Sequence, residues 1–150
     1  MQHTSILMPD ADLRGAERRV ISILRAWNAG SDAQIVMRED LSASLGEVRT
    51  RSCLQAFEQM FALLKAHSWN ALTIMPVGMK GLSRDETAIA RFVMAATEQR
   101  RETALAEASF IVSATALLPI LCAASRFGLP LLCEECRHRV FQASLNTPLN

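Results

Sequence analysis

The sequence predicts an all-α fold, a single-domain bundle of six or seven helices with one longer irregular loop around residues 69-82. Apolar residues recur at spacings of three and four along most of the chain, which is the period of helices packed on one face. Half of the 150 residues are hydrophobic and only 21% are charged, so the chain has enough apolar surface for a core. No repeat and no Gly-, Ser- or Pro-rich linker divides it. We expect one domain, 1–150, with flexible termini at 1–9 and 146–150.

The first predicted helix begins after Asp10 and ends at Gly30, whose backbone tolerates a helix terminus. Arg14, Arg18 and Arg25 lie on its expected outer face. Its expected inner face is apolar and consists of Leu13, Ala16, Val20, Leu24 and Trp27.

Two further helices are predicted on either side of Gly46. In the helix before this glycine, apolar residues repeat every four positions, at Ala33, Met37, Leu41 and Leu45. The helix after it is longer, and its expected inner face consists of Thr50, Cys53, Leu54, Phe57, Met60, Phe61 and Leu64.

Pro76, Gly78 and Gly81 interrupt the helical pattern and define the irregular loop. The helix that follows begins at Ser83, because Ser83 and Glu86 have the spacing of a capping box. Its expected buried stripe is Ile89, Phe92, Val93 and Ala96.

A charged hinge at 98–102 precedes a further helical run from Thr103. We expect Gly128 and Pro130 to separate a last helix, 131–145.

Residues 108–125 carry no charge, and their number approaches the length of a membrane span. Ser113 and Thr115 dilute the hydrophobicity, and Pro119 suits the first turn of a helix. Two short buried helices, the second capped by Ser113 or Thr115, explain the same residues, so we expect no membrane association. A helix that is apolar on most sides is enclosed by its own chain or by a second copy, and we expect a homo-oligomer, most simply a homodimer, or another protein partner.

Cys133 and Cys136 form a CxxC pair, a spacing at which two thiolates hold zinc or exchange as a disulfide. Structural zinc takes four ligands, and the other two would have to come from elsewhere: Cys122, His138, His67 or Cys53. On a helix, Cys133 and Cys136 share a face and His138 points away from both.

The alternative, which we favour, treats the same cysteines as core residues. Cys133, Cys136, Val140 and Ala143 have the spacing of a buried stripe in which cysteine serves as a small apolar residue. Cys53 and Cys122 also lie among apolar neighbours, and we expect both to be packing residues.

Residues 40–57 resemble a bacterial helix-turn-helix, in which one helix ends at Leu45, the chain turns at Gly46 and a second helix follows. Glu47 stands where such motifs place a hydrophobic residue. The resemblance implies DNA binding through the polar residues at the start of the second helix, Arg49, Arg51 and Gln55. An ordinary helix hairpin explains the pattern equally, and we expect no nucleic-acid partner.

Sixteen Lys and Arg against fifteen Asp and Glu give a net charge of +1, which provides no bulk attraction for nucleic acid. No glycine-rich phosphate loop, GxSxG elbow or HExxH pair occurs. We therefore expect no catalytic residue and no cofactor, with zinc at the cysteine pair as the alternative. The first residues do not form a secretory signal, so a cytoplasmic protein with reduced thiols is expected.

These patterns favour a non-enzymatic regulatory or protein-interaction domain. The alternatives are a zinc- or thiol-using protein that works through Cys133 and Cys136, and a helix-turn-helix-like DNA-binding regulator.

Overall fold

A computed structural model describes residues 13–146 and confirms the all-α fold. Within this range the chain forms no strand, only an isolated bridge between Ser68 and Val112. Its elements are α1 (Gly15–Ala29), α2 (Ser31–Leu45), α3 (Glu47–His67), α4 (Arg84–Thr97), α5 (Arg101–Ser109), the 3-10 helix η2 (Ala114–Ala116) and α6 (Leu117–Asn146). The irregular connection between α3 and α4 is the predicted loop. Of the termini expected to be flexible, only Asn146 is described, and it ends α6.

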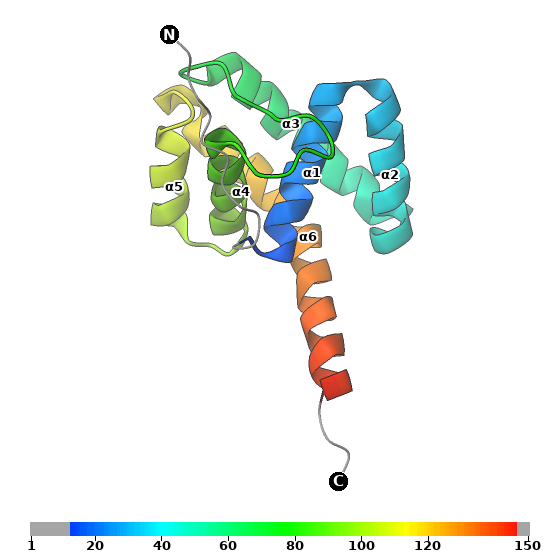
Figure 1. Cartoon of the computed structure of the whole chain (residues 1–150). Coiled ribbons are helices and arrows are strands. Elements are labelled where there is room, and N and C mark those ends of the chain that lie inside the picture. The colour runs from blue at the N-terminus through cyan, green and yellow to red at the C-terminus, as the bar shows by residue number, and fades with distance from the viewer. Residues whose placement is uncertain (1–12, 147–150) are drawn as a thin grey trace.

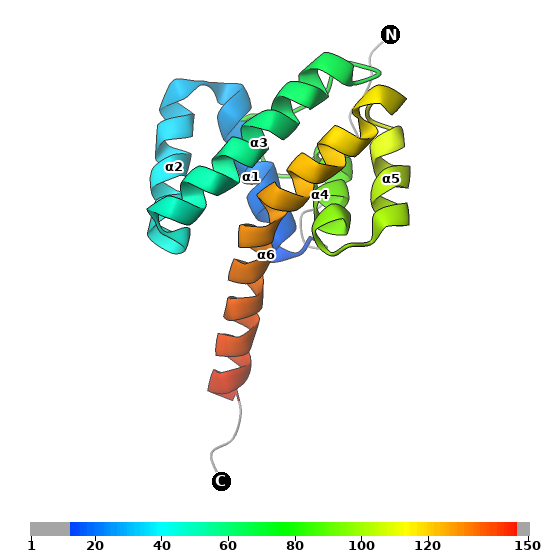
Figure 2. The ribbon, with the colours of Figure 1, turned by 180° about the vertical axis from the view of Figure 1, so that it is seen from behind.

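The first half of α6 is central to the bundle. It packs beside α3 in one layer and against α4 behind it (Figure 2). Helix α1 contacts α2, α4 and α6, while α2 lies at one edge of the molecule and α5 at the other (Figure 1). Several helices therefore depend on the first half of α6 for their packing.

Aromatic rings fill the space between α1, α3 and α6. The ring of Phe57 lies 5.4 Å from Trp27, 5.4 Å from Phe61 and 5.1 Å from Phe127, measured between centroids. All seven residues expected on the inner face of α3 are buried, and so is the predicted stripe of α4. The helical period thus located most of the core correctly.

The expected break at Gly128 and Pro130 is wrong, because α6 continues from Leu117 to Asn146. Gly128 is buried where α6 crosses α4. A Cβ atom at this position would lie 2.0 Å from Thr97 Oγ1 and 3.0 Å from Val93 Cγ1. Gly128 is therefore a site of close helix contact and not a helix terminus.

Pro130 bends α6 without ending it. Its ring nitrogen carries no hydrogen and cannot donate to the carbonyl of Arg126, which is the usual cause of a helix bend. Helix α6 changes direction along its length and its second half leaves the bundle (Figure 2).

The uncharged stretch also differs from the two short helices expected there. Helix α5 ends at Ser109, and η2 leads directly into the 30-residue α6. Ser113 precedes η2, and its hydroxyl lies 3.2 Å from that of Thr115. Both Phe110 and Leu118 are exposed, so burial of this stretch is only partial.

Arg25, expected on the outer face of α1, is instead buried in an ion pair with Glu86, with Nε 2.6 Å from Oε2. Its guanidinium also donates to the carbonyls of Met79 and Gly81, at 2.9 and 2.8 Å. Glu86 accepts from the backbone N–H of Ser83 and forms the predicted capping box. The ion pair of Arg25 and Glu86 thus connects the irregular loop with α1 and α4.

The substitution Gly128→Ala is expected to lower the free energy of unfolding by about 1–3 kcal/mol, because overpacking outweighs the gain in helix propensity. Thr97 has little freedom to move aside, since its hydroxyl donates to the carbonyl of Val93 at 2.7 Å. Urea unfolding measures the change. Gly15→Ala is the matched control, because nothing lies within 4 Å of a Cβ there. Equal stability of Gly128→Ala and wild type would contradict the close crossing.

The substitution Arg25→Met is expected to lower the free energy of unfolding by about 3–5 kcal/mol, because it leaves the carboxylate of Glu86 buried and unpaired. Burial raises the pKa of Glu86, but hydrogen bonds from Arg25 and from two backbone N–H groups bring this pKa below its ordinary value. This stabilisation is therefore complete above the unfolded-state pKa of about 4.3 and is lost as the pH falls through the folded-state pKa.

Glu86→Gln is accordingly expected to flatten the acid limb of the stability curve. Urea unfolding between neutral and acidic pH measures it, with the exposed Glu58→Gln on α3 as control. If the free energy of unfolding fell as steeply with acid in Glu86→Gln as in wild type, protonation of Glu86 would not be a cause of the acid sensitivity.

Candidate functional site

The second half of α6, residues 131–146, projects from the bundle and is called the arm (Figures 1 and 2). At 1.5 Å per residue it extends about 24 Å. Leu131 and Glu135 are buried where the arm leaves the bundle, whereas Arg137 and Val140 further along are exposed. The arm therefore offers a long exposed helical surface.

One face of α6 carries a line of exposed apolar and thiol side chains, interrupted at Ser125. At 100° per residue these six residues fall within about 60° of one another. We call this face the outer stripe, and it consists of Leu118, Cys122, Leu129, Cys133, Cys136 and Val140. The opposite face fills the core with Ile120, Ala123, Ala124, Phe127 and Leu131.

The expectation that Cys122, Cys133 and Cys136 are core residues is wrong, since all three are exposed. The predicted stripe of Cys133, Cys136 and Val140 has the right period, but it faces outward. Helix α6 carries two apolar stripes, and the bulkier one, with Ile120 and Phe127, takes the core position because it removes more apolar surface from water.

Cys53 is buried as predicted. Its thiol donates to the carbonyl of Phe127 at 3.4 Å, and burial raises the pKa of Cys53 to about 12. A thiol with so high a pKa stays protonated at neutral pH and is unsuited to metal binding or redox exchange.

The arm is amphipathic, but its polar face is the one that continues the core-facing side of α6. Beyond Leu131 its core-facing side continues with Glu134, Glu135 and His138, while its outward side is the outer stripe. As far as His138, polar groups thus face the bundle and apolar groups face away from it, whereas Leu145 near the end of the arm is exposed on the opposite side from the outer stripe.

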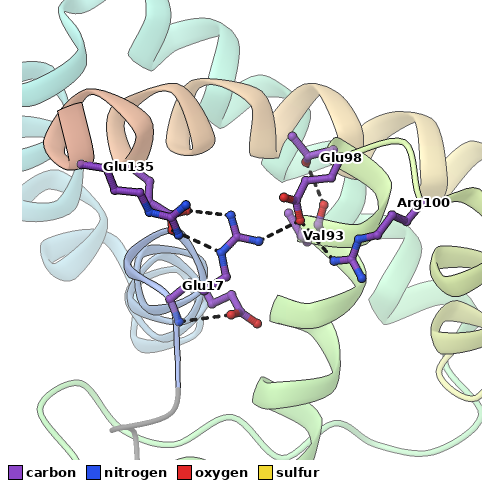
Figure 3. Close-up of polar contacts among 8 residues, drawn as sticks. Glu17, Val93, Glu98, Arg100 and Glu135 are labelled. Carbon is purple, nitrogen blue, oxygen red and sulfur yellow. Dashed lines mark hydrogen bonds and ion pairs between the residues drawn. The ribbon is translucent and has the colours of Figure 1, made fainter. Parts of the chain in front are cut away.

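A network of charges fixes the base of the arm. The guanidinium of Arg14, at the start of α1, lies 2.8 Å from Glu98 at the end of α4 and 3.2 Å from Glu135 on α6. Arg100 donates to Glu98 at 3.1 Å, and Arg139 donates to Glu135 at 2.5 Å. Glu98 and Glu135 lie on opposite sides of the network (Figure 3). Three helices are therefore joined where the arm begins.

The hydrogen bond between Arg14 and Glu98 shifts both pKa values toward the charged forms. It raises the pKa of Arg14 above its already high ordinary value and lowers that of Glu98. Sequence reasoning placed Arg14 on a solvated face and did not connect it with Glu98 or Glu135, because the three lie far apart in the chain.

A hollow of about 160 Å³ lies beside this network between α1 and the arm. Across it the guanidinium of Arg19 lies 3.7 Å from Glu134, and the rest of the lining includes Gly15, Leu131 and His138. The lining thus combines one guanidinium, two carboxylates and the imidazole of His138 with apolar groups of α1 and α6.

His138 lines this hollow, while Cys133 and Cys136 belong to the outer stripe, so the expected divergence of His138 from the two cysteines is found. Across residues 13–146 no three His, Cys, Asp or Glu side chains gather closely enough to hold a metal ion. The cysteine pair thus supplies two ligands from one chain.

The helix-turn-helix residues Arg49, Arg51 and Gln55 are all exposed on α3. Helical geometry separates them, because Arg49 lies about 160° around the axis from Arg51. Arg51 shares its edge of the helix with Glu47 and Glu58, whose charges would repel a phosphate backbone. The three residues do not form one basic surface.

The helical stretch Ala114–Val140, which comprises η2 and most of α6, is long and apolar enough to cross a membrane by length and composition, with a mean hydropathy of 1.8. Core helices of soluble proteins pass the same test. The inner face of its first half is filled by α3 and α4, so its apolar character has a role within the bundle.

Comparisons with protein-family models, with characterised proteins and with solved structures gave no match. Function is therefore argued from the surfaces of this chain alone.

The substitution Arg14→Met is expected to loosen the base of the arm, because it removes a guanidinium shared by Glu98 and Glu135. Amide hydrogen exchange over residues 131–140 should accelerate about tenfold relative to α3, as expected for losing one charged hydrogen-bonding group. The control is Arg100→Met, which removes only the partner on the far side of Glu98. Unchanged exchange in the arm would show that the network does not hold it.

Proposed function

We propose that the chain is a non-enzymatic protein-interaction domain that works as a homodimer through the outer stripe of α6. The observation that carries this proposal is the exposure of apolar side chains along one helix face, with Leu118 61%, Leu129 55% and Val140 70% exposed. An apolar face that extends from the bundle onto a projecting helix is typical of a surface that a partner covers. A reducing compartment such as the cytoplasm would keep its three thiols free.

The spacing of the stripe favours a second copy as the partner. Cys122, Leu129, Cys136 and Ala143 recur every seven residues, the repeat by which two helices pack along their length. At the centre, Leu129, Cys133, Cys136 and Val140 are separated by four, three and four residues. This order reads the same in both directions, so it is compatible with an antiparallel pair of identical helices.

A two-fold axis through the midpoint between Cys133 and Cys136 therefore places apolar residues opposite apolar residues and cysteines opposite cysteines. Leu129 comes opposite Val140 of the second copy, and Cys133 comes opposite Cys136 of the second copy. In this register position 146 comes opposite position 123 of the second copy, so the paired stretch ends short of Cys122 and Leu118. Because the core occupies the opposite face of α6, the two bundles lie on the outer sides of the pair.

Leu129→Lys and Val140→Glu are each expected to convert the dimer to a monomer, because each places a charge against an apolar side chain. Sedimentation equilibrium at micromolar concentrations measures the mass. Val36→Lys is the control, since Val36 is equally exposed but lies on α2. A wild-type mass of one chain across the concentration range, or recovery of the chain only with detergent, would overturn the proposal.

The double variant Leu129→Lys/Val140→Glu tests the direction of pairing. In the antiparallel register each lysine meets a glutamate, so association should recover by about tenfold over either single variant. In a parallel pair, lysine would meet lysine and glutamate would meet glutamate. A double variant that associates no better than the single variants would overturn the antiparallel arrangement.

A further inference from the structure

We propose that pairing of two arms creates a zinc site from Cys133 and Cys136 of both copies. This inference rests on the homodimer described above. It accounts for a CxxC pair that is exposed on a projecting helix, where cysteine contributes little to the core of its own chain.

The first step is the ligand count. Structural zinc prefers four tetrahedral ligands, and thiolates are preferred donors. One chain supplies two, because His138 lines the hollow on the other side of the arm and Cys53 is buried at Phe127. The set is completed only when a second chain adds the same pair.

The second step is the geometry of one helix. Residues three apart hold their Cβ atoms about 5–6 Å apart on a shared face, and helical proteins use this spacing to direct two ligands to one metal. Cys133 and Cys136 have this spacing, and their face is free of contacts that would hold the thiols elsewhere in the described structure. Zn–S bonds of about 2.3 Å then draw both sulfurs toward one ion.

The third step is the two-fold axis. When Leu129 lies opposite Val140 of the second copy, the two-fold axis of the pair runs midway between Cys133 and Cys136. An ion on this axis faces two thiols from each helix in equivalent positions. Leu129 and Val140 lie one turn away on either side and would shield the metal from water.

The fourth step is the charge of the site. Four thiols lose their protons to solvent on binding, and the resulting zinc tetrathiolate carries a net charge of about −2. Arg137 follows Cys136 directly, and its side chain lines a hollow with Ser44, Glu134 and His138. It would have to turn from this hollow toward the thiolates to compensate part of the charge.

Zinc content of the full-length protein, purified under reducing conditions, tests the proposal together with its mass. We expect one zinc ion per two chains, loss of that zinc in Cys136→Ser, and full retention in Cys122→Ser. Cys122 is the matched control because it is exposed on the same stripe but lies about 16 Å along the helix from Cys133. Cobalt(II) added to chelator-treated protein should give the absorption of a tetrahedral thiolate site, with an end point at one ion per two chains.

The outcomes separate this inference from the proposed dimer. A dimer that takes up neither metal would overturn the zinc site and leave the dimer standing. A zinc-free monomer would overturn both. One metal ion per chain, held by a monomer, would overturn the shared site, and so would equal zinc content in Cys136→Ser and wild type.

Discussion

The contact between α4 and α6 at Gly128 fixes which face of α6 points inward, and most of the molecule depends on that choice. A side chain at this position would collide with Thr97, so the two helices approach closely only in this orientation. The same orientation directs Ile120 and Phe127 into the core and leaves the outer stripe on the opposite side. Pro130, two residues later, then turns the second half of α6 away from the bundle. Packing at one glycine thus determines which side of α6 stays exposed.

Helix α1 contributes the ion pairs that connect the helices around this packed core. It contacts α2, α4 and α6, and two arginines at its ends connect these elements, whereas Arg18 is exposed. Arg25 joins the irregular loop to α4 through Glu86, while Arg14 joins α4 to the arm through Glu98 and Glu135. Each guanidinium binds groups from two other elements and so fixes their relative positions. A single ion pair on the surface contributes little to stability by comparison.

Features that depend on local residue spacing could be predicted from the sequence. Two kinds of feature could not: which of two apolar faces of a helix is buried, and which residues far apart in the chain come into contact. The all-α fold, the irregular loop, the inner face of α3 and the capping box at Ser83 follow from helical period and local hydrogen bonding. The same period could not tell which of two stripes on α6 is buried, so Cys133 and Cys136 were placed in the core. Gly128 and Pro130 are common at helix ends, and only the contact with Thr97 shows why this helix continues. Arg25 and Glu86 are 61 residues apart, and no spacing rule connects them.

The proposed dimer and the proposed zinc site would act on the same stretch of the arm. Leu129 and Val140 are more than half exposed, so a second copy that covered them would remove apolar surface from water. Association also costs freedom of motion, and two apolar side chains from each chain form a small contact. A zinc ion held by Cys133 and Cys136 of both copies would add its binding free energy to the same pair. The two proposals would therefore reinforce one another, because the apolar contact brings the thiols together and the metal would strengthen the contact.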